Sequence, residues 1–327
     1  KVYICKIRKK KKGNEKKKIG LFGNGGVWGY YGGKLANYYQ QRAVAEVFFI
    51  ARNENLLAIK QKGLRVETPT ESFTAFPALV TDSPQDIGVV DYLFLCTKSY
   101  DLETNIAQLQ PLIGKDTILI PLLNGGNMTE QIQSILPYNE IWQGCVYIGS
   151  RLTEPGLITK FTEKDQLYFG SSGGNEQQQH QLLSLLTDAG INANNPEDIT
   201  QRIWEKFLRI STAATITSYY NQSIGKVIEN HYDDFLKLGN EFISVAKAKG
   251  INFPENSCVR TIEAQKMMPY ESTTSMHTDF IKGKPTELET ITGYIVRCAK
   301  EFNIQVPTYS LMYNELKENK IKPGYPL

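Results

Sequence analysis

A glycine-rich turn directly after a short apolar segment constrains this chain more than any other feature. The apolar run at 18–22 predicts a buried strand, and it stops at Gly23-Asn24-Gly25-Gly26-Val27, where a helix is predicted to begin. Glycines in this context allow a tight turn and a close approach of the backbone to a pyrophosphate, and the helix N-terminus supplies N–H donors. These five residues are therefore candidate cofactor-binding residues for a dinucleotide.

One position departs from the usual glycine pattern. Where a third glycine normally permits close packing of the helix on the strand, this chain has Trp28, followed immediately by Gly29. Either the helix is shifted or Trp28 turns outward. A glycine-rich turn without a ligand is the alternative interpretation, but seven glycines between Gly20 and Gly33 are more than one turn needs.

Apolar runs and helical patterns alternate along the first half of the chain. Strands are predicted at 18–22, 44–50, 64–66, 73–80, 91–97, 117–121 and 145–148, and helices at 27–40, 53–62, 101–112 and after residue 127. Strands separated by helices imply a parallel, doubly wound sheet.

Beyond a polar stretch at 194–198 the strand signals give way to long helical periodicity. Asp198 is placed to cap one long helix, residues 235–245 mark another, and apolar residues recur at three- or four-residue intervals after Glu287. This spacing puts Glu287 in the first turn of a third helix. The predicted fold is an α/β N-terminal Rossmann-type doubly wound sheet plus an all-α C-terminal domain. We divide the chain into a basic N-terminal extension (1–16), a Rossmann-type domain (17–195) and a helical domain (196–327).

The formal net charge of +3 is the sum of two unlike parts. Residues 1–18 hold ten Lys or Arg residues and one acid, and subtracting these from 37 basic and 34 acidic residues leaves 27 and 33, a net charge of −6. An acidic body argues against a nucleic-acid partner. The extension is expected to be disordered or non-native, with the natural start near Lys17. A nucleic-acid or nuclear-import patch is the alternative interpretation of its lysine run.

Composition argues against several other classes of protein. The apolar runs are far shorter than the roughly 20 residues that cross a bilayer, so no membrane partner is expected. The five cysteines are widely spaced without a C-x-x-C pair, and the three histidines have no metal-ligand spacing. These patterns predict no disulfide framework, no metal and a cytoplasmic location. The chemistry is therefore expected to use an organic cofactor.

The end of the second predicted strand bears on the choice between NAD and NADP. NAD sites usually place an acid there against the ribose 2′-hydroxyl, whereas a cation accommodates the 2′-phosphate of NADP. This strand ends at Ala51-Arg52 with no acid at its tip, and a guanidinium suits bidentate contact with a phosphate. The sequence thus favours NADP(H), with Arg52 as the candidate phosphate-binding residue. Arg52 as a mere surface cation is the alternative, and Glu54 nearby complicates the assignment.

Three further polar residues are candidates for substrate chemistry. Lys98 and Asn124 each follow a predicted buried strand, at the sheet edge that faces the ligand crevice in open α/β folds. Lys206 lies on a predicted helix among apolar neighbours, where a lysine can also simply extend to water. From the residues alone, structural and functional interpretations stay open for all three.

Several short motifs are spread along the chain. They are the glycine turn 23–32, Ala51-Arg52, Thr97-Lys98-Ser99-Tyr100, Asn124-Gly125, Pro155-Gly156, Trp204-Glu205-Lys206, Ser275-Met276-His277-Thr278-Asp279 and Thr286-Glu287-Leu288-Glu289. Their order and spacing, including the interval between Asp279 and Glu287, resemble the ketopantoate reductase (2-dehydropantoate 2-reductase) family from about Lys17 to the last helix.

The resemblance implies that NADPH and a small-molecule keto acid meet in a cleft between the two domains. It implies reduction of 2-dehydropantoate (ketopantoate) to pantoate in pantothenate and coenzyme A biosynthesis. The implied catalytic residues are Lys206, as general acid towards the carbonyl, and Glu287, which binds the substrate hydroxyl. Ser275 is implied to help hold the carboxylate, while Lys98 and Asn124 lie near both nicotinamide and substrate.

These residue types suit the chemistry that the resemblance implies. Hydride transfer to a ketone develops alkoxide charge, which a positioned ammonium both stabilises and protonates. Burial and nearby cations would lower the pKa of Lys206, whereas Glu287 would raise it, so its protonation state stays open.

The match is incomplete on the substrate side. Family members commonly carry asparagines four and eight residues after the lysine and another before the serine motif, where this chain has Ile210, Ala214 and Ser272. Either the keto acid differs or other groups compensate, such as Ser211, Thr212 or Thr215.

Two other functions stay open at this point. One is a related NADPH-dependent reductase of another 2-keto or 3-hydroxy acid, which a keto-acid panel with both cofactors would distinguish. The remote alternative is a non-catalytic NADP-binding sensor that uses the basic extension. It predicts salt-sensitive DNA or RNA binding that is lost on deleting residues 1–16. The oligomeric state is not fixed by the sequence, and a homodimer is compatible with it.

Overall fold

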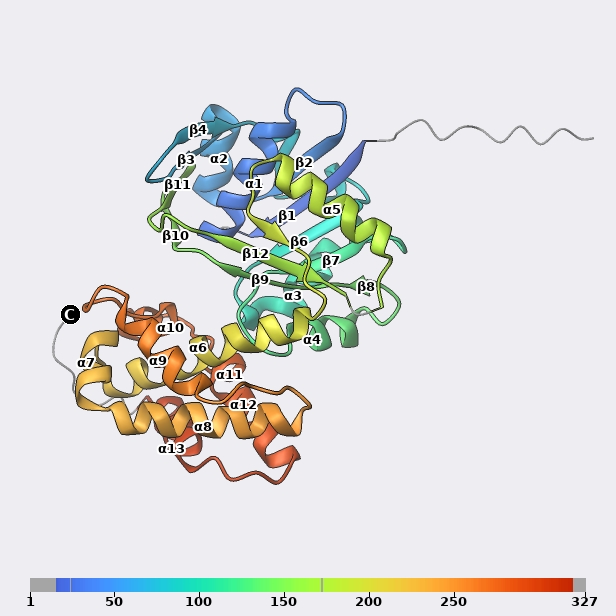
Figure 1. The fold of residues 1–327 in the computed structure, drawn as a ribbon. Coiled ribbons are helices and arrows are strands. Elements are labelled where there is room, and N and C mark those ends of the chain that lie inside the picture. Colours follow the sequence, from blue (N-terminus) through green and yellow to red (C-terminus); the bar gives the residue numbers. More distant parts are fainter. Residues whose placement is uncertain (1–15, 24, 172, 320–327) are drawn as a thin grey trace, which may run out of the picture.

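The computed structural model describes residues 16–23, 25–171 and 173–319. Figure 1 shows an α/β part followed along the chain by an all-helical part, which confirms the predicted fold class. The strands are β1 (Lys17–Gly23), β2 (Ala45–Ile50), β3 (Leu64–Glu67), β4 (Ser72–Ala75), β5 (Leu79–Thr81), β6 (Tyr92–Cys96), β7 (Ile118–Pro121), β8 (Glu140–Ile141), β9 (Gln143–Tyr147), β10 (Ser150–Glu154), β11 (Leu157–Lys160), β12 (Gln166–Gly170) and β13 (Ala193–Asn194). The helices of the α/β part are α1 (Gly26–Tyr39), α2 (Asn53–Lys62), α3 (Leu102–Leu109), α4 (Met128–Ile135) and α5 (Glu176–Asp188).

A six-stranded parallel sheet forms the centre of the α/β part. Its strand order is β5-β2-β1-β6-β7-β8, with Leu21 of β1 paired to Phe49 on one side and to Phe94 on the other. These strands are apolar on both faces because helices and further strands cover both sides. The loops that follow β1, β6 and β7 all lie at the carboxyl edge of this sheet, where ligands of open α/β folds bind.

Two smaller sheets depart from the simple alternation predicted from the sequence. The expected strand at 73–80 is two strands, because Pro77 lacks an N–H and interrupts the pairing; β4 joins the sheet β10-β11-β3-β4, and β5 joins the central sheet. The expected strand at 145–148 belongs to β9, which pairs antiparallel with β12 in a sheet of its own. The hairpin of β10 and β11 was not predicted.

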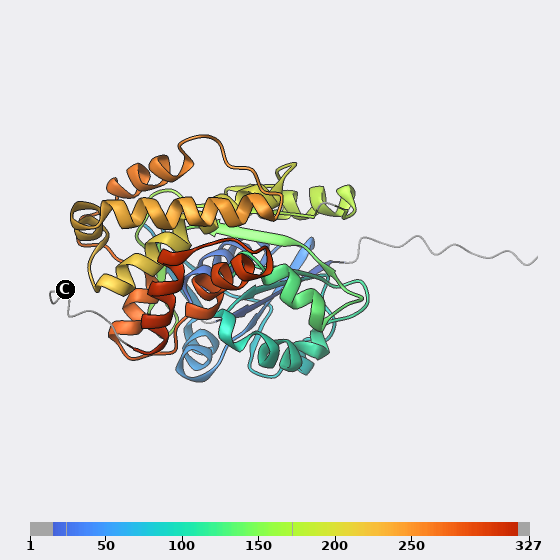
Figure 2. The ribbon, with the colours of Figure 1, turned by 90° about the horizontal axis from the view of Figure 1, so that it is seen from below.

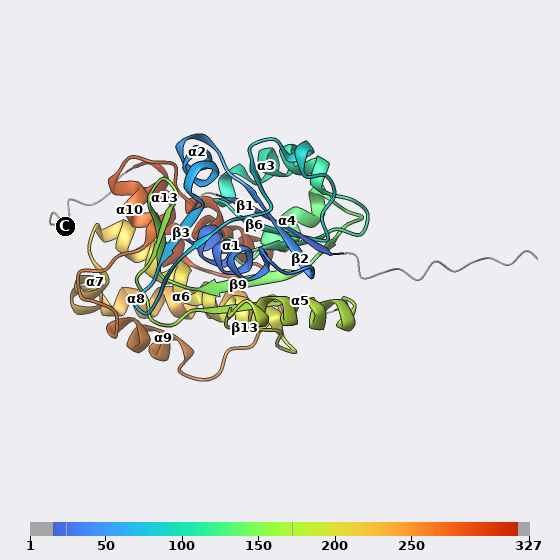
Figure 3. The same ribbon diagram turned by 90° about the horizontal axis from the view of Figure 1, so that it is seen from above.

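Helix α1 lies between the central sheet and the β10-β11-β3-β4 sheet, and Figure 3 shows it in the midst of the α/β part. Of the two alternatives for Trp28, the one in which it turns outward is wrong. Its side chain is fully buried, its ring lies 5.0 Å from that of Phe49, and its Nε1 donates a hydrogen bond to the Leu21 carbonyl at 3.0 Å. Close packing occurs one turn later, because a Cβ at Gly32 would lie 2.9 Å from the Phe49 ring.

The helical part has its own apolar core around α6 and α8, which lie side by side (Figure 2). Asp198 caps α6 as predicted, accepting from the Gln201 N–H. The helix expected after Glu287 is interrupted at Thr292, whose hydroxyl hydrogen-bonds to Thr215 of α6. The helices of this part are α6 (Ile199–Tyr220), α7 (Ile224–Asn230), α8 (Tyr232–Ala248), α9 (Ser257–Lys266), α10 (Ser275–Ile281), α11 (Leu288–Ile291), α12 (Gly293–Glu301) and α13 (Pro307–Lys317).

We propose the domain boundary at 195/196, because β13 ends at Asn194 and α6 begins at Ile199. Residues 1–15 lie outside the described residues, as does Asn24 of the glycine turn.

Candidate active site

A pocket of about 490 Å³ lies between the carboxyl edge of the central sheet and the helical part. Its sheet side consists of the glycine turn and the segments that follow β6, β7 and β9. Its helical side comes from α6, α7, α9, α10 and α11. The residues predicted from the sequence that line it are Gly25, Gly26, Val27, Lys98, Asn124, Lys206, Ser275 and Glu287.

The described glycines of the turn have three different steric environments. Gly23 has φ +158°, and a Cβ there would lie 2.8 Å from the Cys96 carbonyl oxygen. A Cβ at Gly26 would lie 2.2 Å from the backbone of Ser150, so β10 passes directly against the start of α1. At Gly25 a Cβ would meet nothing within 4 Å, because this residue faces open space. The backbone at Gly25 is therefore accessible from the pocket.

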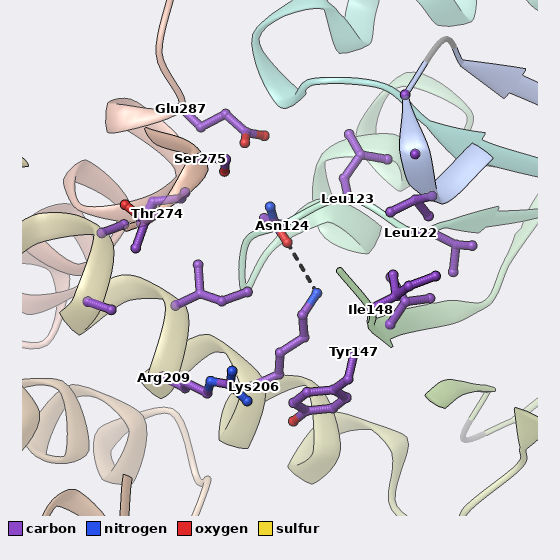
Figure 4. A pocket seen from close by; sticks show the side chains of 18 of the residues that line it. Leu122, Leu123, Asn124, Tyr147, Ile148, Lys206, Arg209, Thr274, Ser275 and Glu287 are labelled. Atoms are coloured by element: carbon purple, nitrogen blue, oxygen red, sulfur yellow. Dashed lines mark hydrogen bonds between the residues drawn. The ribbon is translucent and has the colours of Figure 1, made fainter. Parts of the chain in front are cut away.

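Lys206 lies on α6, and its amine points across the pocket to the loop after β7. Its Nζ donates a hydrogen bond to Asn124 Oδ1 at 3.1 Å, drawn as the dashed line in Figure 4. The side chain is 8% exposed, so the interpretation that it extends to water is wrong. Burial lowers the pKa of Lys206, and nearby Arg209 lowers it further, while the charges of Cys145 and Glu287 oppose this; the net direction is downward.

Glu287 forms the cap position of α11 and is only 2% exposed. Its Oε1 accepts hydrogen bonds from the N–H and the hydroxyl of Ser99, at 3.3 and 3.2 Å. Its Oε2 lies 3.3 Å from Lys98 Nζ, which also binds Asp279 Oδ2 at 2.9 Å. Burial alone lowers the pKa of Lys98, but the two carboxylates outweigh it and raise the pKa.

Ser275 is the first residue of α10 and points into the pocket near Glu287 (Figure 4). The helix begins here because the Thr274 hydroxyl accepts the His277 N–H. His277 is itself fully buried, with Nδ1 2.6 Å from Thr273 Oγ1 and Nε2 2.9 Å from Asn221 Oδ1. The serine is thus held by a helix start that is tied to the end of α6.

Arg52 is not brought into this pocket. It follows β2, is exposed, and contacts the Gln108 side chain and the ring of Phe22. Glu54 is exposed nearby, in the first turn of α2. No acidic residue occupies the tip of β2 between Ile50 and Arg52.

Compensation by Ser211, Thr212 or Thr215 was one of two alternatives for the missing asparagines, and none of the three lines the pocket. Ile210 and Ala214 line the pocket, so the wall is apolar at these positions. Their polar neighbours on α6 point into the helical core instead. The hydroxyl of Ser211 bonds to the Ile291 carbonyl and Tyr309, that of Thr212 to the Leu208 carbonyl, and that of Thr215 to Thr292.

Arg209 and Gln265 are among the lining residues that sequence reasoning missed. Arg209 lies three residues after Lys206 on the same face of α6, a spacing that was visible in the sequence. Gln265 of α9 is 1% exposed, lines the pocket, and has a buried Nε2 without a hydrogen-bond partner. Nothing in the sequence near Gln265 indicated this position.

Sequence comparison gives a match to one family over most of the chain. The family described as Ketopantoate reductase PanE/ApbA matches residues 19–174, and its C-terminal region, Ketopantoate reductase PanE/ApbA C terminal, matches residues 198–320. The chain belongs to the ketopantoate reductase family. The pocket lies where the two matched segments meet.

Relatives and solved structures of ketopantoate reductases agree with this assignment. A 2-dehydropantoate 2-reductase of a Nostoc species is 26% identical over 309 residues, covering 92% of this chain and 94% of that protein. The crystal structure of 2-dehydropantoate 2-reductase from Porphyromonas gingivalis W83 is 39% identical, with a TM-score of 0.82 over 92% of this chain and 99% of that one. A ternary structure of D-mandelate dehydrogenase with NADH and anilino(oxo)acetate shares the fold, at 22% identity and a TM-score of 0.80 over 93% of this chain and 98% of that one.

Two further observations concern the described residues. Among the residues that the structure describes, no three His, Cys, Asp or Glu side chains are grouped to hold a metal ion. None of the helices within the described ranges has the length and apolar character needed to cross a bilayer.

Proposed function

We propose that this oxidoreductase reduces 2-dehydropantoate to pantoate with NADPH, in pantothenate and coenzyme A biosynthesis. One observation carries the proposal: a buried lysine, Lys206, is hydrogen-bonded to Asn124 in the pocket that also contains the glycine turn and Glu287. A cation in this environment can stabilise an oxyanion and protonate it.

The residues around the start of α1 fit a dinucleotide. No described side chain caps α1, and its first turn contains no acidic residue, so its N–H groups and positive dipole end are free for a pyrophosphate. Gly25 leaves open space next to these donors. A nicotinamide bound here would supply a hydride to the substrate carbonyl carbon.

Arg52 supports NADPH over NADH as the cofactor. The residue follows β2, where the adenosine ribose is recognised in this fold class, and no acid is present at the strand tip. Its guanidinium is exposed and forms no salt bridge among the described residues, where its partners are the neutral Gln108 and Phe22, so it is available to a 2′-phosphate.

Lys206 and Glu287 have separate roles in the proposed reaction. In this reaction the Lys206 ammonium donates its proton to the carbonyl oxygen, and Asn124 orients the amine by accepting one of its hydrogens. Lowering the pKa of Lys206 makes the ammonium a better proton donor to the forming alkoxide. Glu287 is held rigidly by Ser99 and Lys98, so its carboxylate is positioned to accept a hydrogen bond from the substrate hydroxyl.

The second candidate function is reduction of another 2-keto or 3-hydroxy acid. The apolar lining at Ile210 and Ala214 favours it, because the polar side chains common in the family at these positions are missing. Steady-state kinetics over a panel of 2-keto acids, each with NADPH and NADH, tests both functions. We expect the highest kcat/KM with ketopantoate and NADPH. A value for ketopantoate no better than for a generic keto acid would contradict the proposal.

We also propose that the protein is cytoplasmic and forms a homodimer. The described cysteines, Cys96, Cys145, Cys258 and Cys298, are free thiols, which suits a reducing cytoplasm. Fractionation and light scattering would test a cytoplasmic homodimer.

A further inference from the structure

The charges that line the pocket are unequally compensated. Lys98 is neutralised by Asp279 and Glu287. Arg209 is half-buried. Its Nη2 makes a weak hydrogen bond to Met268 Sδ at 3.8 Å, and among the described residues Arg209 forms no salt bridge. A guanidinium facing a pocket without a carboxylate partner is suited to an anionic group of the ligand.

Arg209 is placed one helical turn from the proposed proton donor. Residues three apart on a helix are neighbours, roughly 5–6 Å apart at Cβ. In Figure 4 Arg209 lies beside Lys206 and on the same side of the pocket as Thr274, whereas Leu122 and Ile148 lie across from it. A 2-keto acid carries its carbonyl and its carboxylate on adjacent carbons. One turn of α6 therefore offers a cation for each of these two groups.

Gln265, which also lines the pocket, provides an independent observation. Its Nε2 is buried without a partner, and buried amide hydrogens without partners are uncommon in proteins. It belongs to α9, and Met268, which contacts the Arg209 guanidinium, lies only three residues further along the chain. A ligand oxygen in the pocket would satisfy this amide.

We propose that Arg209 and Gln265 bind the substrate carboxylate in place of the missing asparagines. The inference rests on the proposed function in that it takes the substrate to be a 2-keto acid. The guanidinium donates two parallel hydrogen bonds to the carboxylate, and the Gln265 amide donates a third. Ser275, at the start of α10, completes the polar lining, while Ile210 and Ala214 contact the carbon skeleton.

The test compares each keto acid with its neutral methyl ester. For Arg209→Gln we expect KM for the acid to rise about 100-fold, and for Gln265→Leu about 10-fold, from the loss of charge-assisted hydrogen bonds. The KM of the ester and the Kd of NADPH should stay nearly unchanged. Arg202→Gln is the matched control, because Arg202 lies on the same helix outside the pocket and pairs with Glu205. Circular dichroism and thermal melting confirm that each variant is folded.

The outcomes separate this proposal from the proposed function. The comparison uses whichever keto acid the wild-type enzyme reduces best, so a preference for an acid other than ketopantoate contradicts only the proposed function. Equal losses for acid and ester, or weaker NADPH binding with unchanged KM for the acid, overturn the role of Arg209. If the wild type reduces no keto acid, binding of pantoate and of its neutral lactone to the NADP⁺-saturated enzyme is measured instead. Pantoate binding that is absent, or that Arg209→Gln leaves intact, then overturns the proposal.

Discussion

Lys206 of α6 and Asn124 after β7 are joined by a hydrogen bond of 3.1 Å between Nζ and Oδ1. This contact links the helical part to the carboxyl edge of the central sheet. A second link runs through Glu287, which is bound by Ser99 and Lys98 after β6. Both proposed catalytic side chains thus come from the helical part and are oriented by residues of the α/β part.

Replacing Lys206 by alanine should remove most of the turnover. General acid catalysis typically contributes about 10²–10⁴-fold, so we expect kcat to fall by about that factor. The Kd of NADPH, measured by fluorescence titration, should change little because Lys206 acts on the substrate. Lys237→Ala, an exposed lysine of α8, is the control. Unchanged turnover would remove Lys206 from the proposed role.

Replacing Arg52 by aspartate should change the cofactor preference. A carboxylate at this position repels the 2′-phosphate and can accept a hydrogen bond from a ribose 2′-hydroxyl. We expect kcat/KM for NADPH to fall far more than kcat/KM for NADH. Equal losses with both cofactors would show that Arg52 does not bind the phosphate.

The pH profile of kcat/KM should have an alkaline limit set by Lys206. Activity requires its ammonium form, so it is present below the pKa of Lys206 and lost as pH rises through it, at a pH below the 10.5 of an ordinary lysine. The Glu287 charge raises this pKa, so Glu287→Gln should move the limit to lower pH, besides reducing the rate. The Arg209 charge lowers it, so Arg209→Gln should move the limit to higher pH. A limit that neither variant moves would assign it to another group.

Buried His277 should make the fold sensitive to mild acid. Burial lowers the pKa of His277 from 6.5 to about 4, so the unfolded chain binds a proton that the folded chain excludes. Stability is therefore complete above the unfolded pKa and declines as pH falls from about 6.5 towards 4, by about 2 kcal/mol at pH ~5. Denaturant unfolding of His277→Gln should show a flatter pH dependence. The exposed His180, replaced in the same way, should leave the wild-type slope.

Sequence patterns predicted those parts of the fold that short-range interactions along the chain determine. The strand, the glycine turn and the helix at 18–40 were predicted, and so was the Asp198 cap. Each of these elements is determined by residues that lie close together in the chain. The β10-β11 hairpin was missed although its own pairing is local, and its further pairing with β3 joins segments about ninety residues apart. The alternation of strands and helices gives no information on such distant pairing.

On the substrate side of the pocket, prediction from the sequence failed for a different reason. Along α6, residues 210 to 215 rotate by about 100° each around the axis, so only some of them face the pocket. Ser211, Thr212 and Thr215 were plausible from their chemistry, but the side facing the pocket is set by packing of α6 against α8 and α11. The helix is buried on nearly all sides after Lys206, so hydrophobic periodicity does not identify the ligand face. Gln265 was missed for another reason: α9 has an exposed and a buried face, and nothing in the sequence indicated that a polar glutamine lies on the buried one.

The burial of Trp28 has a practical consequence. Its indole lies in the first turn of α1, two residues after Gly26, at the end of the helix where a dinucleotide would bind. Indole emission overlaps the absorption of reduced nicotinamide, so a bound reduced cofactor would quench it by energy transfer. The chain therefore contains a natural optical reporter of nucleotide occupancy. It needs no label, requires no turnover, and would respond in variants that have lost all catalytic activity.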